Sequence, residues 1–237
     1  MAAAAARRAL FPFLQVLPQK ALFSSVEETA SSAADENEAA AAQLLNDLTG
    51  SYQELWPVIL ADEYKQTWLD DCTALVGEDN AEAAFEKLSS MVTGDVYGED
   101  AVKAYANGGG AYFCGFTNSL AILTFDGETS TISGTDKDGN VLFSHTYHYI
   151  GMEPVRGLYE FQSDDADSGE FTYFFLAPDT SAETYHIEFR YGSDAEALSQ
   201  YDTGEYAYWL ASGISTDCDQ TMIDNCIELF CTENLAG

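Results

Sequence analysis

The chain contains three histidines, His145, His148 and His186, and each lies in a segment whose pattern predicts a β-strand. His186 is followed two residues later by Glu188. Because side chains alternate along a strand, both point to the same face, about 6–7 Å apart at Cα. An imidazole and a carboxylate from one strand can hold a divalent metal ion when neighbouring strands add ligands. The alternative is a buried pair that only satisfies its own hydrogen bonds.

His145 and His148 are three positions apart on one predicted strand. This odd spacing directs the two rings to opposite faces of the sheet. At most one of them can therefore join a site that contains His186. The same reasoning separates Ser144 from His145, so the two cannot act directly as a nucleophile and its base.

Motifs of common enzyme classes are missing from the sequence. It has no GxSxG, HExxH, phosphate-loop or dinucleotide-binding glycine pattern. Residues 135–140 begin like a calcium-binding loop, but the twelfth position counted from Asp136 is Tyr147, where that loop needs Glu. We predict a hairpin turn there instead. We expect a binding protein and not an enzyme.

From residue 111 onward the apolar pattern has the period of two that is typical of β-strands. Turn-forming Gly, Asp and Pro residues separate the short apolar segments, as hairpin connections require. Seven such strands predict a barrel or a sandwich and exclude a parallel α/β sheet. The predicted strands are Ala111–Asn118, Leu120–Phe125, Ser130–Gly134, Val141–Ile150, Leu158–Gln162, Glu170–Leu176 and Thr184–Gly192.

Helical patterns flank these strands. Before them, apolar residues such as Tyr52, Leu55 and Trp56 recur at helical spacing. After them, Ala195–Tyr201 and Asp217–Leu229 are predicted helices. We expect one domain over residues 44–237, divided into a helical part at 44–106, a β-barrel at 111–192 and C-terminal helices at 193–237.

Two segments precede the predicted domain. Residues 1–26 are rich in Ala, contain adjacent arginines and lack acidic residues, which is typical of a secretory signal peptide or an organellar transit peptide. Residues 27–43 consist mainly of Glu, Ala, Ser and Asp. With little to bury, they predict an acidic, Ala-rich tether or the frayed start of a helix.

The strongly acidic composition restricts the kinds of molecule that the protein can bind. All 40 acidic residues lie from Glu27 onward, together with only six of the nine basic residues. Such a surface repels nucleic acid and anionic membranes and attracts cations diffusely. No apolar run approaches the ~18–20 residues of a membrane span.

The five cysteines contain no CxxC pair, so a cysteine zinc cluster is not expected, and their odd number leaves the disulfide connectivity open.

Three stretches together resemble the ZinT (YodA-like) family of zinc- and cadmium-binding domains. They are Gly50–Leu60, the strands Phe174–Pro178 and Thr184–Gly192, and the helix with its aromatic block at Asp194–Trp209. The resemblance extends over about residues 44–234. It implies an α+β fold, a mainly antiparallel calycin- or lipocalin-like β-barrel with flanking N- and C-terminal helices. It also implies export and a zinc site at the barrel mouth.

In this family the ligands are a His before an Ala-Pro turn and a His-x-His on the next strand. In this sequence the first His of His-x-His corresponds to His186 and the second to Glu188, which can also bind metal. The His before Ala-Pro corresponds to Phe174, which cannot. We expect His148 or His145, from a neighbouring strand, to replace the lost ligand.

The resulting hypothesis is an exported protein that binds Zn²⁺, or Cd²⁺ or another divalent ion, and buffers or delivers it. We expect a secreted, periplasmic or cell-surface location, with an organelle as the alternative. The resemblance implies a zinc ABC-transporter system as partner. Glu160 and Glu170 are further candidate donors, although surface positions are favoured for both. The alternative function is a barrel module with a decayed metal site that binds a small apolar ligand or a partner protein.

Overall fold

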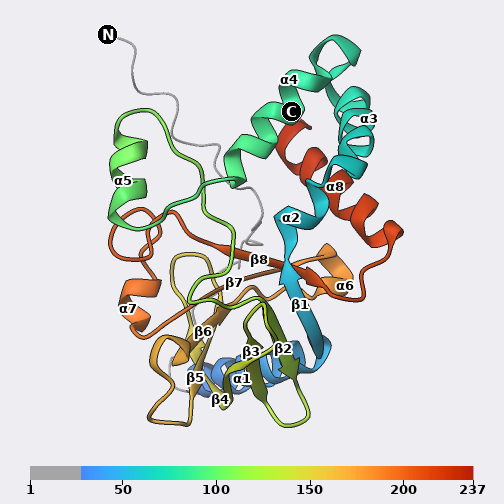
Figure 1. Ribbon diagram of the computed structural model, residues 1–237. Coiled ribbons are helices and arrows are strands. Elements are labelled where there is room, and N and C mark those ends of the chain that lie inside the picture. The colour runs from blue at the N-terminus through green and yellow to red at the C-terminus, as the bar shows by residue number, and fades with distance from the viewer. Residues whose placement is uncertain (1–27, 237) are drawn as a thin grey trace.

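The computed structural model describes residues 28–236. The predicted leader at residues 1–26 lies outside this part. Eight antiparallel strands form a closed barrel in which each strand pairs with its neighbours in sequence, and β1 closes the ring by pairing with both β2 and β8 (Figure 1). The strands are β1 Gly50–Glu54, β2 Ile122–Asp126, β3 Thr131–Thr135, β4 Val141–Met152, β5 Tyr159–Ser163, β6 Tyr173–Leu176, β7 Ile187–Gly192 and β8 Ala211–Ser215.

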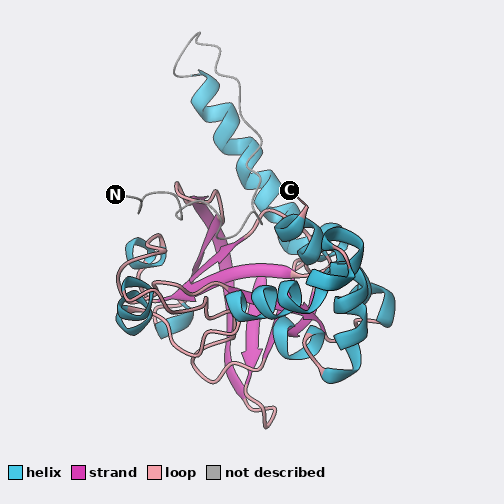
Figure 2. Ribbon diagram, turned by 90° about the horizontal axis from the view of Figure 1, so that it is seen from above, coloured by secondary structure: helices cyan, strands magenta, loops and turns pink. Residues whose placement is uncertain are grey.

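Helices flank the barrel on opposite sides (Figure 2). This arrangement confirms the predicted α+β fold class, with an up-and-down antiparallel barrel of the calycin kind at its centre. The helices are α1 Glu28–Asp47, α2 Leu55–Ile59, α3 Lys65–Val76, α4 Glu78–Val92, α5 Glu99–Ala106, α6 Ser181–Thr184, α7 Ala195–Leu198 and α8 Gln220–Leu235, with short 3₁₀ turns η1 Asp62–Tyr64 and η2 Gly169–Phe171.

Aromatic side chains fill the barrel interior. Phe174 is fully buried, and its ring centroid lies 5.3 Å from that of Tyr191 and 5.4 Å from that of Tyr147. Alternate positions along the strands supply this core, as the pleat of a sheet requires. Other buried members are Leu123, Phe125, Ile132, Phe143, Phe161, Phe189 and Trp209. The interior of the barrel is therefore a packed, largely aromatic core.

A second core lies outside the barrel, between α2, α3, α4 and α8. Trp68 of α3 is fully buried there, its indole N–H donates to the Ile59 carbonyl at 2.7 Å, and its ring meets that of Phe230 edge to face. Because α2 follows β1 directly and α8 follows β8 after a short turn, this core continues from the two strands that close the barrel.

The segment 27–43 differs from a tether. Residues 28–47 form α1, which contacts β2 and β4 of the barrel. Leu44, Leu45 and the adjoining Leu48 are at most 3% exposed, so the helix is docked through its last turns. Alanine is the best helix former, and the apolar residues that dock the helix lie at its C-terminal end.

The boundaries of the barrel also differ from those predicted. β1 replaces part of the expected helix and β8 lies within the expected C-terminal helical part, so the barrel extends beyond residues 111–192. The strand predicted at 111–118 is absent, and Phe113 makes only isolated bridges to Thr93 and Trp209. The strands β1 and β8 pair only with residues that are far away in sequence. The periodicity of a short segment carries no information about such distant pairing.

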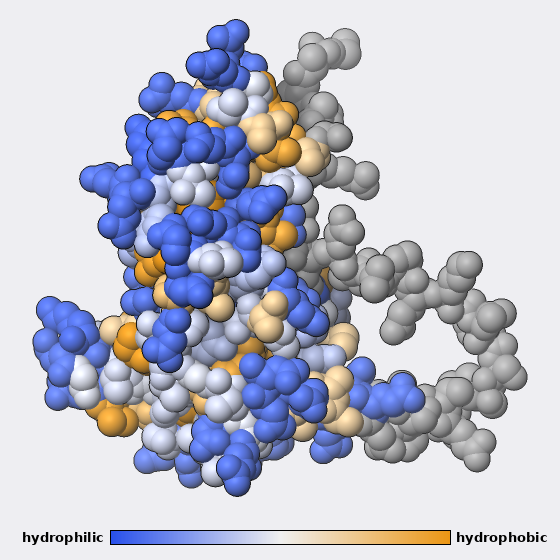
Figure 3. All heavy atoms as spheres, turned by 90° about the vertical axis from the view of Figure 1, so that its right-hand side faces the viewer, coloured by the Kyte–Doolittle hydropathy of each residue, from blue (hydrophilic) through white to orange (hydrophobic). Residues whose placement is uncertain are grey.

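The surface on the side of α3 and α8 is mainly hydrophilic, with apolar residues scattered through it (Figure 3). Among the described residues, no helix has the length and apolar character needed to cross a membrane.

Candidate functional site

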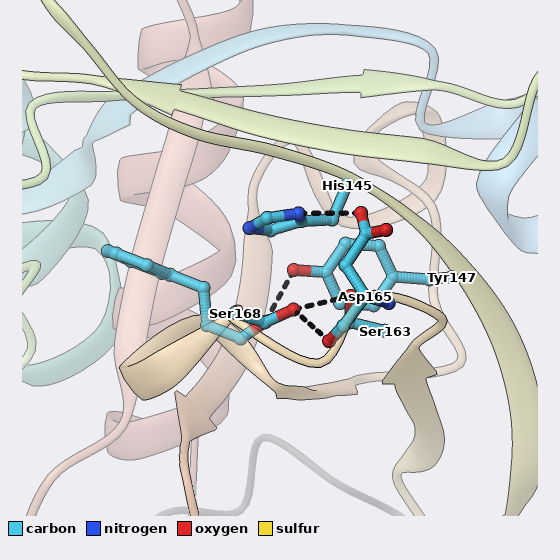
Figure 4. A network of polar contacts seen from close by, with 6 residues as sticks. His145, Tyr147, Ser163, Asp165 and Ser168 are labelled. Atoms are coloured by element: carbon cyan, nitrogen blue, oxygen red, sulfur yellow. Dashed lines mark hydrogen bonds and ion pairs between the residues drawn. The ribbon is translucent and has the colours of Figure 1, made fainter.

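His145 and His148 each pair with an aspartate of the loop between β5 and β6. His145 Nδ1 donates to Asp165 at 2.8 Å, and His148 Nδ1 donates to Asp164 at 2.6 Å. Figure 4 shows the His145–Asp165 pair beside a network of loop contacts. The His148 side chain is about half exposed. These pairs attach the loop to β4.

The remaining contacts in Figure 4 also hold this loop in place. The Ser168 hydroxyl donates to the Asp165 carbonyl at 2.8 Å, and its oxygen lies 2.7 Å from Ser163 Oγ, whose hydroxyl it can accept. Tyr147 donates its hydroxyl to the Phe171 carbonyl at 2.5 Å. The serine hydroxyls thus bond within the loop and anchor it.

His186 lies immediately before β7, after a left-handed residue, Tyr185, that ends the short helix α6. The Thr184 carbonyl accepts a hydrogen bond from His186 Nδ1 at 2.6 Å. Because a carbonyl can only accept, Nδ1 must carry the hydrogen, and in a neutral ring Nε2 then carries the lone pair. This Nε2 faces Glu188, whose Oε1 lies 4.0 Å away. A backbone carbonyl that fixes the tautomer in this way is common behind metal-binding histidines.

His186 and Glu188 line a small cavity between β7, the β6–α6 connection and the C-terminal end of α8. Its volume is about 60 Å³, enough for an ion with a few water molecules. Asp179 from the connection and Glu233 from α8 contribute two further carboxylates. The other lining residues are Ala177, Thr184 and Leu229. One imidazole and three carboxylates therefore surround one enclosed space.

Burial dominates the electrostatics of this cavity. The Glu188 side chain is only 9% exposed, and the one polar contact recorded for its carboxylate among the described residues is the long approach to His186. Burial raises the pKa of Glu188 to about 8; the charge of Arg156 opposes this, and those of Asp179 and Glu233 add to it. The protein thus holds a buried carboxylate with no direct cationic partner, which favours its protonation.

The two other carboxylates behave in the same way. Burial, and then the charge of Asp179, raise the pKa of Glu233 to about 7, and Glu233 Oε2 is buried with no hydrogen-bond partner in the part of the chain that the structure describes. Burial, followed by the charge of Glu183, raises the pKa of Asp179. Burial lowers the pKa of His186, which favours the neutral, metal-binding ring. A cation in this cavity would relieve all three carboxylates at once.

The structure brings together only part of the predicted ligand set. His186 and Glu188 share the cavity, whereas neither His145 nor His148 lines it. The expected replacement of the lost ligand by one of these two is therefore not found, because β5 and β6 separate β4 from β7 in the barrel. Within residues 28–236, no three His, Cys, Asp or Glu side chains already stand in a metal-binding arrangement.

Phe174 and the two additional candidate donors also lie elsewhere. Phe174 packs in the barrel core. Glu170 accepts hydrogen bonds from Ser193 and Tyr206, and Glu160 is a β5 residue that does not line the cavity. Sequence reasoning missed Asp179 and Glu233, and in a chain with 40 acidic residues no local signal distinguishes them.

Comparison with known proteins gives a distant structural likeness. No family model matches the chain, and no curated protein matches its sequence. The Zn(II)-bound ZinT-like domain of Streptococcus pneumoniae AdcA is similar with a TM-score of 0.49 and 15% identity, over 78% of this chain and 89% of that one. Zn(II)-bound AdcA from the same organism gives 0.46 and 14%, over 77% of this chain and 34% of that one.

A second hollow lies between α2, the end of α4 and the segment around Phe113. It is an open groove of about 310 Å³. Trp56 lines it, and within residues 28–236 the buried indole N–H of Trp56 has no hydrogen-bond partner apart from a weak contact with the Cys114 thiol. The other lining residues are Glu54, Pro57, Leu60, Val92, Thr93, Gly94, Phe113, Cys114 and Gly115.

Proposed function

We propose that the protein binds a divalent metal ion, zinc by preference, in the cavity between β7 and α8. The observation that carries this proposal is Glu188, a nine-tenths-buried carboxylate beside an imidazole whose tautomer is fixed for ligation. A buried carboxylate without a cationic partner is costly when ionised, and it must take up either a proton or a cation.

The donor chemistry suits zinc. We assign His186 Nε2 and the Glu188 carboxylate as the first two ligands, with Asp179 and Glu233 as the groups that complete the set by side-chain rotation. Zinc accepts mixed nitrogen and oxygen ligands, and the imidazole disfavours calcium and magnesium, which prefer oxygen alone. The buried, partnerless oxygen of Glu233 supports this assignment. When bound, the metal would supply the positive charge that the three carboxylates lack.

The role that follows is metal binding, in the sense of buffering or delivery, and not catalysis. We place this role outside the cytoplasm because of the composition of residues 1–26. A zinc ABC-transporter system is the partner class that the sequence resemblance suggests. Cadmium is the second candidate ion, because it accepts the same donors.

Isothermal titration of zinc into chelator-treated protein tests the proposal. Wild type should bind one zinc ion tightly, and His186→Ala and Glu188→Gln should each weaken binding at least tenfold. Asp179→Asn and Glu233→Gln should weaken it several-fold. His148→Ala removes a histidine that pairs with Asp164 outside the cavity, so it is the matched control and should bind like wild type. Equal zinc binding by wild type and His186→Ala would contradict the proposal.

The alternative, an apolar-ligand module, has a specific location in this structure. The barrel interior is packed, but the groove at Trp56 offers apolar walls and a buried N–H without a strong acceptor. The occupant it fits is a small apolar molecule with one hydrogen-bond acceptor. A solvatochromic naphthalene-sulfonate dye should then gain fluorescence with wild type and lose most of that gain with Trp56→Phe, whereas unchanged dye fluorescence on adding wild type would exclude this site.

A further inference from the structure

Two buried cysteines from distant parts of the chain meet in the helical core. Cys72 of α3 and Cys231 of α8 are 159 positions apart, and their Sγ atoms lie 3.9 Å from each other. Neither residue is exposed. The two helices pack against one another along this contact, as Figure 1 also shows.

We propose that Cys72 and Cys231 form a disulfide bond under oxidising conditions and thereby fasten α8 to α3. A disulfide needs sulfur atoms about 2.05 Å apart and Cβ atoms about 3.8 Å apart. The two sulfurs, 3.9 Å apart, must approach by about 2 Å, and rotation about the two Cα–Cβ bonds is the movement that can bring them together. The helices need not move far, because both are held by the same apolar neighbours.

The other three cysteines have different surroundings. Cys226 Sγ lies 4.0 Å from His186 Nδ1, and Cys114 Sγ approaches the Tyr112 carbonyl at 3.9 Å. Cys218 is partly exposed. All five cysteines belong to the described residues, and the Cys72–Cys231 approach is the one sulfur–sulfur contact recorded among them. The odd number of cysteines is therefore resolved into one pair and three single thiols.

The chemistry requires an oxidant, and a small disulfide such as oxidised glutathione supplies it. The thiolate of one cysteine attacks this disulfide, forms a mixed disulfide and releases one reduced glutathione. The second cysteine, losing its proton, then attacks the mixed disulfide and releases another. Two protein thiols are oxidised by two electrons and one glutathione disulfide is reduced. Because burial raises the pKa of both thiols, we expect the bond to form during folding, when the sulfurs are still accessible.

The bond would have two structural consequences. It would enclose seven of the eight barrel strands, β2 to β8, in one covalent loop and so limit the freedom of the unfolded chain. It would also hold the helix that carries Leu229 and Glu233, two walls of the cation cavity. The second consequence rests on the proposed function, whereas the bond itself does not.

The experiment refolds the full chain from urea at pH 8 with a mixture of oxidised and reduced glutathione. Thiols are then counted in guanidinium, and the alkylated, unreduced protein is digested for mass spectrometry. We expect three free thiols instead of five and a linked peptide pair containing Cys72 and Cys231. The oxidised protein should unfold about 10 °C above the dithiothreitol-treated protein.

Two variants complete the test. Cys231→Ser should retain four free thiols after refolding, and dithiothreitol should leave its unfolding temperature unchanged. Cys218→Ser, which replaces a thiol outside the pair, should still form the linked peptide and is the matched control. Five free thiols in refolded wild type, or a linked peptide from any other pair, would overturn the proposal. The number of free thiols in wild type tests the proposed disulfide even when a variant fails to fold. A failure of the protein to bind zinc would not affect this test.

Discussion

At the scale of single residues, we expect Glu188 to make the stability of the metal-free protein depend on pH. Its pKa is raised from 4.5 to about 8, chiefly by burial. Between these two values the folded protein binds a proton that the unfolded chain releases, so the free energy of unfolding of the metal-free protein should fall as pH rises from about 4.5 to 8. The total loss should be about 3–5 kcal/mol. Urea denaturation with a chelator at pH 5, 6.5 and 8 measures it.

Glu188→Gln is the matched variant for this measurement, because an amide has the same shape and stays neutral at every pH. It should lose most of the slope and keep a smaller one, which Glu233, with its pKa of about 7, still supplies. At pH 8 the variant should be more stable than metal-free wild type. Identical slopes for both proteins would show that Glu188 does not carry the titration.

At the scale of elements, α1 should contribute directly to stability. Leu44 is 3% exposed and packs into the barrel-side core, so Leu44→Ala should lower the free energy of unfolding by about 2–5 kcal/mol. Gln43→Ala changes the neighbouring exposed residue, which bonds to Asp47 on the helix surface, and should cost under about 0.5 kcal/mol. Urea denaturation compares the two. Equal, small losses would indicate that the segment behaves as the tether that composition suggested.

Some strands and helices could be predicted from the sequence, and others could not. Seven regularly spaced segments indicated the barrel, and β2 to β7 lie within or close to six of them. The helical spacing of Tyr52, Leu55 and Trp56 was misleading because these three residues do not belong to the same hydrophobic core. Tyr52 faces the barrel core from β1, whereas Leu55 and Trp56 face the helical core from α2. The chain crosses between layers inside one apparently periodic segment, and no local pattern records that crossing.

Sequence reasoning identified two of the four ionisable residues that line the candidate site and missed the other two. His186 and Glu188, which the sequence singled out, line one cavity because both belong to one short segment, although His186 precedes β7 and strand alternation does not extend to it. Asp179 reaches that cavity from the preceding loop and Glu233 from the last helix. Their convergence depends on barrel closure and on the docking of α8, which residue types alone do not specify.

At the scale of the whole molecule, the net charge of −31 is a destabilising feature that salt should relieve. Lysine offsets little of it: Lys65 lies 3.9 Å from Glu82 and Lys103 lies 3.0 Å from Asp100, both at exposed positions where ion pairs stabilise weakly. Repulsion between the remaining carboxylates acts over about 10 Å at 0.1 M salt and about 3 Å at 1 M.

Raising NaCl from about 0.02 to 0.5 M should therefore shift the urea midpoint of the chelator-treated protein upward, because screening weakens repulsion more than it weakens the few attractive pairs. Urea is the suitable denaturant, since guanidinium would itself screen the charges. His186→Ala should show the same salt-dependent shift, because diffuse repulsion does not depend on the cavity. Zinc at equimolar concentration, in contrast, should stabilise wild type and not this variant. An unchanged or lower midpoint in salt would mean that the acidic residues are arranged without net repulsion in the folded state.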